Sequence, residues 1–433
     1  MLIVSAETRM GSDRLVIVDG VRTPFCKAGT DLAGLDAVEL GRIAVTALLA
    51  RTGIDPEIVD EVVFGCVGQP VDAMNVARVL ALRAGLPRSA PAVTVHRNCA
   101  SSMEAVTQAY EKMAAGAGSV FIVGGTESMS DLPLLFPRRA VGKFTRLARA
   151  RTLGRRLAAL ASFRPADFKP RIGLELGLTD PVPGLNMGET AEVLAREWAI
   201  SRERQDAFSL RSHQRVVAGR ERLAEEIAPV YRDGRAVALD NGVRPNQTME
   251  QLGKLRPVFQ RRHGTVTAGN SSQITDGAVA LLVMAESRAG ELALEPLGAL
   301  AGYAYAGCDP ERMGMGPVHA IHRAQKKLGL GPADADVVEI NEAFAVQVLA
   351  VLEALRSPEF AREKLGRDEP LGEIPDDKLN VNGGAIALGH PVGSSGGRLV
   401  LTALRELRRR GGKRALASLC VGGGQGAALW LER

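Results

Sequence analysis

Short apolar runs alternate with amphipathic stretches along the first part of the chain. Runs that favour extended backbone lie at 14–25, 59–67, 92–99 and 119–125, and helix-period patterns lie at 36–53, 74–85 and 100–116. Alternation of strands and helices is typical of a parallel or mixed sheet with helices packed on both faces. The pattern therefore predicts an α/β fold.

The same order of elements returns after residue 295. Strands are predicted at 296–307, at 335–345 (running into a helix) and at 415–424, with further helices at 316–329 and 397–412. In the last of these helices Leu399, Ala403 and Leu407 fall on one face. The repeated order indicates an internal duplication, with two copies of one α/β unit.

The region between the two copies differs from both. Residues 126–190 are expected to be irregular, basic and rich in proline and glycine, whereas 188–227 reads as helical with Ser201 as an N-cap. Residues 264–286 form a turn and a strand that should rejoin the sheet of the first copy. We predict three parts, listed by range: 1–125 with 255–292 as the N-terminal half, 126–254 as an inserted loop domain, and 293–433 as the C-terminal half.

Composition narrows the class of protein. The chain has 433 residues, of which 46% are hydrophobic and 24% charged, as in soluble globular proteins, and no apolar run reaches the 18 residues of a membrane span. The start, "MLIVSAETRMGSDR", lacks the layout of a secretion signal. Five widely spaced cysteines without a CxxC pair disfavour a zinc site or a disulfide framework, and free thiols lead us to expect a cytoplasmic protein.

The positive charge is local. Residues 138–171 contain eleven Lys or Arg and one acid, Asp167, so this segment carries +10, and the net charge of +5 leaves −5 for the rest of the chain. Such a segment indicates a surface that meets an anionic partner. Nucleic acid is not expected, because no recognised fold or aromatic platform accompanies the charge.

Cys99, in "TVHRNCASSMEAV", is the first candidate for chemistry. It lies where a helix should begin, and the helix dipole and free N–H groups there stabilise a thiolate. The competing interpretation is a small buried hydrophobe, since free cysteine is among the most buried residue types. Its neighbour Asn98 is expected to be only part of the turn.

A cysteine nucleophile needs a base, and His390 is the best candidate among six histidines. It lies in the glycine-dense stretch "NGGAIALGHPVGSSGG". His213, His319 and His322 fall on ordinary helical patterns, and His263 lies in a turn. His96 lies on the strand before Cys99 and should point elsewhere.

Two further stretches carry polar groups at element ends. Cys420 closes the last strand in "LCVGGGQG", where glycines such as Gly422 free backbone N–H groups for a developing oxyanion, although a structural cysteine is the alternative. The G-x-G-x-x-A pattern there is not a dinucleotide site, because no helix and second strand follow it. Asn341 and Glu342, in "NEAFA", are explained by helix capping, with a role in orienting water as the alternative.

Together these motifs resemble the thiolase family. "NCASSMEA", "NEAFA", "NVNGGAIALGHPVGSSG" and "CVGGGQG" are similar to its four catalytic motifs, and "NMGETAEVLA", "KLRPVF" and "GTVTAGNSSQITDGA" follow the family order. The resemblance covers roughly residues 14–432. It implies a five-layered αβαβα fold made of two duplicated halves, with a loop domain inserted in the first.

The resemblance also implies residue roles. Cys99 would take the acyl group as a thioester, His390 would activate Cys99, and Cys420 would move the proton at the α-carbon of acetyl-CoA. Backbone N–H groups of Cys99 and Gly422 would form one oxyanion hole, and His390 with a water held by Asn341 would form the other. No metal or redox cofactor is implied; coenzyme A and acyl-CoA are substrates.

Coenzyme A contacts carry over less completely. Ser272 matches a serine near the pantetheine arm, Met187, Ala343 and Phe344 match apolar contacts, and Arg244 aligns with a residue near the adenine end. The family often has His where this chain has Asn186, a departure at the nucleotide end of the site.

The implied activity is that of a 3-ketoacyl-CoA thiolase in fatty-acid β-oxidation, with acetyl-CoA acetyltransferase as the alternative. The long basic segment resembles β-subunits of fatty-acid-oxidation complexes, whereas Asn341 and "CVGGGQG" resemble short-chain thiolases. A carrier-protein condensing enzyme would lack Cys420, and a non-catalytic binding protein would not need the four catalytic motifs.

We expect a homodimer or homotetramer. We also expect residues 138–171 to dock on an acidic partner subunit or an anionic membrane, with a solvated helix or attraction of coenzyme A as the alternatives.

Overall fold

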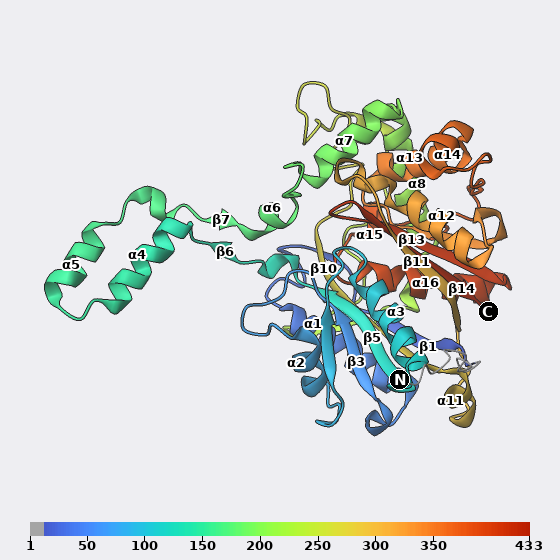
Figure 1. Ribbon diagram of the computed structural model, residues 1–433, viewed down its shortest axis with the longest axis horizontal. Helices are drawn as coiled ribbons and strands as arrows, with labels where there is room; N and C mark the ends of the chain where they lie inside the picture. The colour runs from blue at the N-terminus through green and yellow to red at the C-terminus, as the bar shows by residue number, and fades with distance from the viewer. Residues whose placement is uncertain (1–12) are drawn as a thin grey trace, which may run out of the picture.

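The computed structural model describes residues 13–433. Residues 1–12 lie outside the described residues, and with them most of the start that was inspected for a secretion signal. Across 13–433, no helix has both the length and the apolar character needed to cross a membrane. Figure 1 shows a body that contains both ends of the described chain and a helical hairpin that projects far from it.

The N-terminal half alternates strands and helices as the sequence predicts. Its elements are β1 (Leu15–Arg22), β2 (Cys26–Lys27), α1 (Ala37–Thr52), β3 (Glu61–Gly65), α2 (Val76–Arg83), β4 (Ala92–Val95), α3 (Ser101–Ala114) and β5 (Val120–Glu127). The side chain of Asp36 caps the start of α1, and Gly53, with a φ of 64°, ends it in the left-handed conformation. β10 (Thr275–Ala285) returns to this sheet between β1 and β5, as predicted.

The C-terminal half repeats the plan. Its elements are β11 (Gly298–Gly307), α12 (Gly316–Leu328), β12 (Val337–Ile340), α13 (Ala345–Arg356), α14 (Pro358–Leu365), α15 (Ala385–Leu388), α16 (Ser395–Arg410), β13 (Arg414–Val421) and β14 (Gln425–Glu432). The sequence predicted a single closing strand at 415–424. This was wrong, because Gly423 and Gly424 adopt positive φ and turn the chain into the hairpin strand β14.

Strand order confirms the duplication. The main sheet runs β12-β13-β14-β11-β1-β10-β5-β3-β4. Counted outward from the pairing of β1 with β11, the strands of each half make two antiparallel pairings and then a parallel one. The C-terminal counterpart of β4 is reduced to an isolated parallel bridge between Val338 and Leu379.

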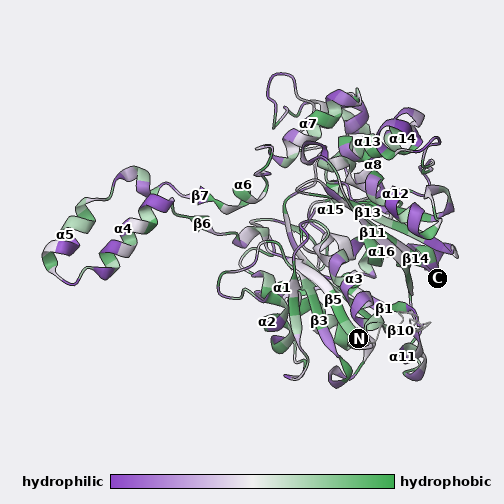
Figure 2. Cartoon of the chain, viewed as in Figure 1, coloured by the Kyte–Doolittle hydropathy of each residue, from purple (hydrophilic) through white to green (hydrophobic). Residues whose placement is uncertain are grey.

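Three buried clusters give the molecule its five layers. One lies between the N-terminal sheet and the outer helices α1 and α2, and another between the C-terminal sheet and α12 and α13. The third contains residues of both sheets together with Met103 and Val106 of α3 and Leu399, Ala403 and Leu407 of α16. Helices α3 and α16 therefore form the middle layer of an αβαβα fold, which confirms the predicted fold class. The N-terminal strands are largely hydrophobic in Figure 2, as this burial requires.

Residues between β5 and β10 are more regular than predicted. They form β6 (Leu134–Leu135), α4 (Arg138–Arg149), α5 (Leu153–Ala161), β7 (Arg171–Ile172), α6 (Gly173–Gly177), α7 (Met187–Glu197), α8 (Arg202–Ala218), α9 (Arg220–Ala224), β8 (Val230–Arg232), β9 (Arg235–Val237) and α10 (Met249–Gly253), and α11 (Glu286–Glu291) follows β10. The expectation of irregular chain at 126–190 was wrong, because 138–149 and 153–161 are helices in the projecting hairpin. Ser201 caps α8 as predicted.

The two halves meet so closely at β5 that a side chain is excluded there. A Cβ on Gly125 would lie 2.0 Å from the carbonyl oxygen of Gly393, in the loop before α16. We therefore expect Gly125→Ala to lower the free energy of unfolding by about 1–3 kcal/mol through overpacking. Urea denaturation measures this change. Gly142→Ala is the matched control, because its Cβ meets nothing within 4 Å and alanine favours helix α4. An unchanged midpoint for Gly125→Ala would contradict the close contact.

Candidate active site

Cys99 lies in the turn between β4 and α3. It precedes the N-cap residue of α3, Ala100, and keeps partial contact with solvent. The turn is possible because Asn98 adopts a left-handed φ of 42°, which asparagine tolerates better than most residues. Asn98 also does more than turn the chain, contrary to expectation, because its Nδ2 donates to the carbonyl of Gly422 at 2.8 Å. It thereby ties the nucleophile candidate to the loop after Cys420.

His390 is buried in the loop before α16, and its ring is oriented by two polar neighbours. Nδ1 lies 2.5 Å from Ser395 Oγ, and Nε2 lies 3.5 Å from Asn341 Nδ2. Ser395 Oγ also donates to the Pro391 carbonyl at 3.0 Å, so this network assigns the ring proton to Nδ1 and leaves Nε2 as the acceptor. Burial, with a smaller effect of Arg398, lowers the pKa of His390 to about 4. The ring is therefore neutral and able to accept a proton.

Asn341 ends β12 within the same buried region. Its side-chain Oδ1 is buried and has no hydrogen-bond partner among the described residues. The predicted capping role was wrong for both Asn341 and Glu342, since the N-cap of α13 is Phe344. Glu342 instead accepts hydrogen bonds from Ser212 Oγ, Asn380 Nδ2 and the N–H of Ile386, which fixes the segment that leads to His390.

Two backbone N–H groups lie close enough to the thiol of Cys99 to affect its pKa. They belong to Gly422 and to Cys99 itself, and each favours the thiolate. Burial outweighs them and raises the pKa of Cys99 to about 11. The resting side chain is therefore a thiol that is poised to lose its proton only when a base accepts it.

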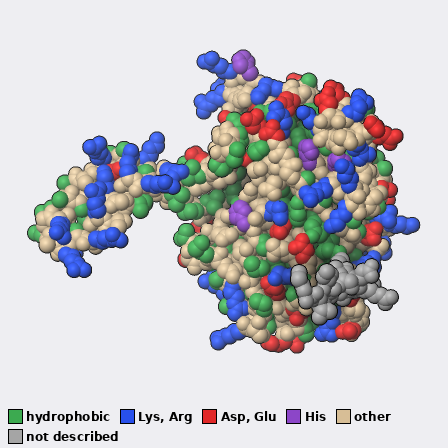
Figure 3. Space-filling model, viewed as in Figure 1, with side chains coloured by type: hydrophobic (Ala, Val, Ile, Leu, Met, Phe, Trp, Pro, Cys, Tyr) green, Lys and Arg blue, Asp and Glu red, His purple; other side chains and the backbone are tan. Residues whose placement is uncertain are grey.

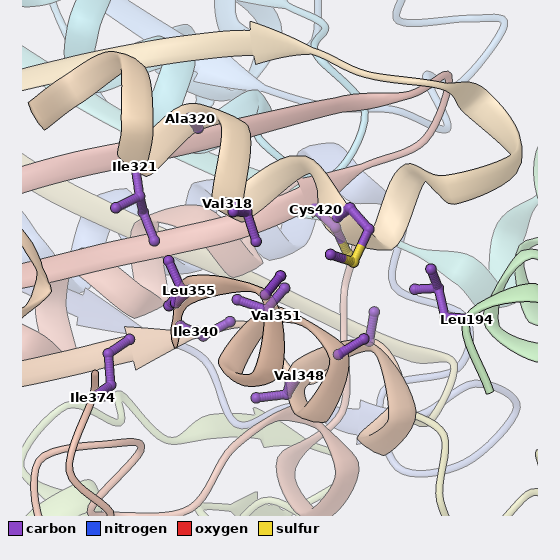
Figure 4. Close-up of a cluster of buried hydrophobic side chains, with 14 of the residues drawn as sticks. Leu194, Val318, Ala320, Ile321, Ile340, Val348, Val351, Leu355, Ile374 and Cys420 are labelled. Carbon is purple, nitrogen blue, oxygen red and sulfur yellow. The ribbon is translucent and has the colours of Figure 1, made fainter. Parts of the chain in front are cut away.

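Cys420 ends β13 and belongs to the buried cluster that Figure 4 draws between α12 and α13. Burial raises its pKa well above that of a free thiol, and the nearby Cys99 raises it further. The two cysteines are thus neighbours, although they come from different halves of the chain. A Cβ on Gly422 would lie 3.5 Å from Met187 Sδ, which brings Met187 to the same site.

Glu127 is a buried acid at this site that the sequence analysis missed. Its carboxylate accepts the N–H groups of Val67, Gly68 and Gly393 at 3.2, 2.7 and 2.8 Å. Burial raises its pKa to about 7, and its charge raises the pKa of Cys99. The available signal was an acidic residue at the end of a strand that is apolar up to Gly125, in "VFIVGGTE".

Three of the residues expected to bind coenzyme A lie together. The N–H of Ser272 donates to the Ala343 carbonyl at 2.9 Å, and Ser271 forms a bridge with Phe344, so Ser272, Ala343 and Phe344 lie together. Arg244 is exposed, and its backbone N–H and guanidinium donate to His213 and Gln247. Asn186 caps α7 by accepting the N–H of Gly188.

No group of three or more His, Cys, Asp or Glu side chains within 13–433 is arranged to hold a metal ion.

Comparisons with known proteins follow the same division into halves. Residues 15–287 match the family model of the thiolase N-terminal domain, and residues 294–433 match that of the thiolase C-terminal domain. The chain belongs to the thiolase family. It is therefore an acyltransferase, and the resemblance of the four motifs to thiolases is confirmed.

Relatives and solved structures cover nearly the whole chain. A 3-ketoacyl-CoA thiolase of Yersinia enterocolitica is 43% identical over 430 residues, which is 98% of each chain. A 3-ketoacyl-CoA thiolase of Serratia proteamaculans is 42% identical over 432 residues, again 98% of each chain. Among solved structures, human mitochondrial 3-ketoacyl-CoA thiolase in complex with CoA superposes with a TM-score of 0.83 at 38% identity, covering 97% of this chain and 98% of that one. Bacillus anthracis acetyl-CoA acetyltransferase gives 0.84 at 35% identity with the same coverage.

The raised pKa of Cys99 and the lowered pKa of His390 predict the pH dependence of thiol reactivity. Between pH 6.5 and 9.5 Cys99 lies below its pKa of about 11, so its thiolate fraction should rise nearly tenfold per pH unit. The measurement is the rate of carbamidomethylation of Cys99 by iodoacetamide, followed by peptide mass spectrometry. A plateau below pH 8 would instead indicate a resting thiolate–imidazolium pair and would contradict this electrostatic description.

Proposed function

We propose that this thiolase cleaves 3-ketoacyl-CoA with coenzyme A, giving acetyl-CoA and an acyl-CoA shortened by two carbons. The observation that supports the proposal is that Cys99 and Cys420, from different halves of the chain, lie close enough to interact, and that the N–H groups of Gly422 and Cys99 favour the Cys99 thiolate. His390, which is buried and neutral, would be the base. The names of the full-length relatives support this substrate class. Coenzyme A is then a substrate, and no metal or redox cofactor takes part.

The first half-reaction consumes the ketoacyl substrate. The Cys99 thiol gives its proton to Nε2 of His390, and the sulfur attacks the 3-keto carbon of the substrate. The carbon–carbon bond between positions 2 and 3 breaks, leaving an acyl thioester on Cys99 and the enolate of acetyl-CoA. Cys420 gives its proton to the enolate carbon, and acetyl-CoA leaves.

The second half-reaction restores the enzyme. The thiol of coenzyme A loses its proton to the Cys420 thiolate and attacks the thioester carbon. The bond to Cys99 breaks, the acyl-CoA leaves, and the Cys99 sulfur recovers its proton from His390. Cys99, His390 and Cys420 thus end the cycle in the protonation states in which they began it.

Oxyanions form in both half-reactions and need hydrogen-bond donors. The N–H groups of Cys99 and Gly422 would bind the oxygen of the thioester carbonyl. Protonated Nε2 of His390, with a water held by the unpartnered Oδ1 or by Nδ2 of Asn341, would bind the enolate oxygen. Each such donor contributes on the order of 3 kcal/mol to stabilisation of the transition state.

The same groups work in reverse, which leaves synthesis of acetoacetyl-CoA as the alternative direction. The structural likeness to an acetyl-CoA acetyltransferase supports that alternative. We favour degradation in cytoplasmic β-oxidation because of the names of the relatives.

We also propose a homodimer or homotetramer, supported by the edge strand β4, whose Ala92, Val93 and Thr94 are only partly buried.

The assigned roles predict different losses for the two cysteines. Incubation with acetyl-CoA should add an acetyl group to Cys99, visible by intact-protein mass spectrometry, and Cys99→Ser should abolish it. Cys420→Ser should still form the acetyl-enzyme but should lose at least a hundredfold in exchange of the acetyl methyl protons with deuterated water, measured by NMR. Loss of acetylation in Cys420→Ser, or its persistence in Cys99→Ser, would overturn the assignment.

The projecting hairpin supports a second proposal, that 138–171 docks on an anionic membrane surface. Phe136, Phe144, Phe163 and Phe168 pack against one another between its arms, and Lys143 pairs with Asp167. Val141, Leu153, Leu157 and Leu160 remain exposed beside the basic residues. Apolar and cationic side chains on one exposed element are typical of helices that bind the membrane interface. An acidic partner subunit is the alternative that fits the same charge.

Sedimentation with vesicles tests this docking. The wild type should bind vesicles containing anionic lipid at low salt, with at least tenfold weaker binding at 0.5 M salt, because each Lys or Arg contributes about 1 kcal/mol near such a surface. A charge-reversed variant, Arg146→Glu with Arg149→Glu and Arg156→Glu, should lose binding while retaining thiolase activity. Failure of the wild type to bind vesicles, together with salt-independent capture of a protein by the hairpin, would overturn membrane docking.

A further inference from the structure

The turn between β13 and β14, residues 422–424, carries a backbone N–H on which the proposed chemistry depends. The N–H of Gly422 favours the Cys99 thiolate and would bind the oxygen of the thioester carbonyl. The turn consists of three glycines, so packing of side chains cannot fix its conformation. At its far end the N–H of Cys308 donates to the Gly424 carbonyl at 2.7 Å. Gly422 needs a partner of its own.

Asn98 supplies that partner from the other half of the molecule. Its Nδ2 donates to the Gly422 carbonyl at 2.8 Å, and a Cβ on Gly422 would lie 3.6 Å from the same nitrogen. Asn98 is also covalently bonded to Cys99, because the two are consecutive in the chain. This single hydrogen bond therefore limits how far the N–H of Gly422 can move from the Cys99 sulfur.

The backbone of Asn98 is itself held in place. Its φ of 42° is left-handed, and Ser101 Oγ donates to its carbonyl at 2.6 Å. The same hydroxyl accepts the N–H of Arg97 at 2.9 Å. A side chain positions a neighbour only when its own conformation is locked by surrounding contacts, and Asn98 meets that condition.

Arg97 fixes the residue before Asn98 against the same turn. Figure 3 shows Lys and Arg side chains spread over the projecting hairpin and the body, whereas the side chain of Arg97 is only 30% exposed. Its guanidinium lies 4.1 Å from the centre of the Tyr305 ring in β11 and donates to Glu104 at 2.6 Å and to Gln425 Oε1 at 3.4 Å. Gln425 immediately follows the glycine turn, so residues 97–98 contact both of its ends.

We propose that Asn98 is a positioning residue that holds the Gly422 N–H in place for the oxyanion of the acyl-transfer step. This inference rests on the proposed thiolase activity. The oxygen of the thioester carbonyl gains negative charge when coenzyme A attacks, and a donor stabilises that charge only at hydrogen-bond distance. Misplacement of such a group by about 1 Å costs on the order of a hundredfold in rate. Asn98 itself need not touch the substrate.

Asn98→Gly tests the inference, because glycine keeps the left-handed backbone and removes only the amide. The kcat for thiolysis of acetoacetyl-CoA should fall about tenfold to a hundredfold, with KM changed less than about twofold, since the lost interaction acts on the transition state. The melting temperature should stay close to that of the wild type. The matched control is Asp233→Gly, the same kind of change at another left-handed residue, with a φ of 48°, in the turn between β8 and β9. It should leave kcat unchanged.

Two further measurements report on the Gly422 N–H without turnover. Because that N–H favours the thiolate, alkylation of Cys99 by iodoacetamide at pH 8 should slow about threefold or more in Asn98→Gly, as expected for a rise of about half a pKa unit. In the acetyl-enzyme made with carbonyl-labelled acetyl-CoA, the infrared stretch of the thioester carbonyl should move to higher wavenumber, because it loses a hydrogen bond.

A second variant, Asn98→Asp, keeps the size of the side chain and also tolerates the left-handed conformation. It presents an oxygen to the Gly422 carbonyl and should lose at least as much kcat as Asn98→Gly. If the wild type is active, unchanged kcat and alkylation rate in both variants would overturn the inference and leave the proposed function intact. A loss confined to KM or to the melting temperature would overturn it likewise. Inactivity of the wild type would overturn the proposed function, and this inference with it.

Discussion

The buried carboxylate of Glu127 holds the two halves of the molecule in the register that the active site needs. It accepts N–H groups from Val67 and Gly68 of one half and from Gly393 of the other. Around it, Gly125 lies directly against Gly393, and Asn98 bonds to the Gly422 carbonyl. Cys99 comes from the first half, whereas His390, Asn341 and Cys420 come from the second. The proposed site therefore depends on the contacts that hold the two halves together.

Exclusion of water at this junction sets the protonation states. Burial raises the pKa of Cys99 and lowers the pKa of His390, so both groups rest uncharged. In the proposed mechanism, a neutral thiol and a neutral imidazole can exchange a proton as the acyl group arrives, without a standing ion pair to desolvate. The same exclusion of water strengthens the hydrogen bonds that stabilise each oxyanion.

Much of the fold could be predicted from periodicity, because both halves bury apolar positions at regular spacing. Asp36 caps the start of α1 and Gly53 ends it, as their residue types suggest. Leu399, Ala403 and Leu407 are all buried on α16. Strand β14 was missed because the glycines before it were interpreted as a loop that binds an oxyanion. In the structure, the positive φ of Gly423 and Gly424 makes a hairpin turn there. Helices α4 and α5 were missed because they project from the body and bury almost no apolar side chain in a core.

Predicting the site needed more than local pattern. Cys99 alone could equally have been a buried hydrophobe, and the resemblance of four motifs to thiolases supplied its partners. Glu127 and the hydrogen bond of Asn98 were not predicted because their partners are backbone groups remote in sequence, namely the N–H of Gly393 and the carbonyl of Gly422. No spacing rule reveals a hydrogen bond that forms only after two halves have docked. The capping interpretation of Asn341 and Glu342 failed for the same reason, since Glu342 is held by Ser212 and Asn380.

Duplication gives Cys99 and His390, the proposed nucleophile and base, related places in the fold. Helices α3 and α16 occupy equivalent places in the two halves. Cys99 immediately precedes the N-cap residue of α3, and His390 lies four residues before the N-cap residue of α16. The two helix starts touch, because Ser102 Oγ accepts the N–H of Gly397 at 2.8 Å. Two helix dipoles therefore present their positive ends to one point. That field favours an anionic sulfur or oxyanion and disfavours a resting imidazolium, so the symmetry that arranges the middle layer also suits the site to chemistry that passes through negative charge.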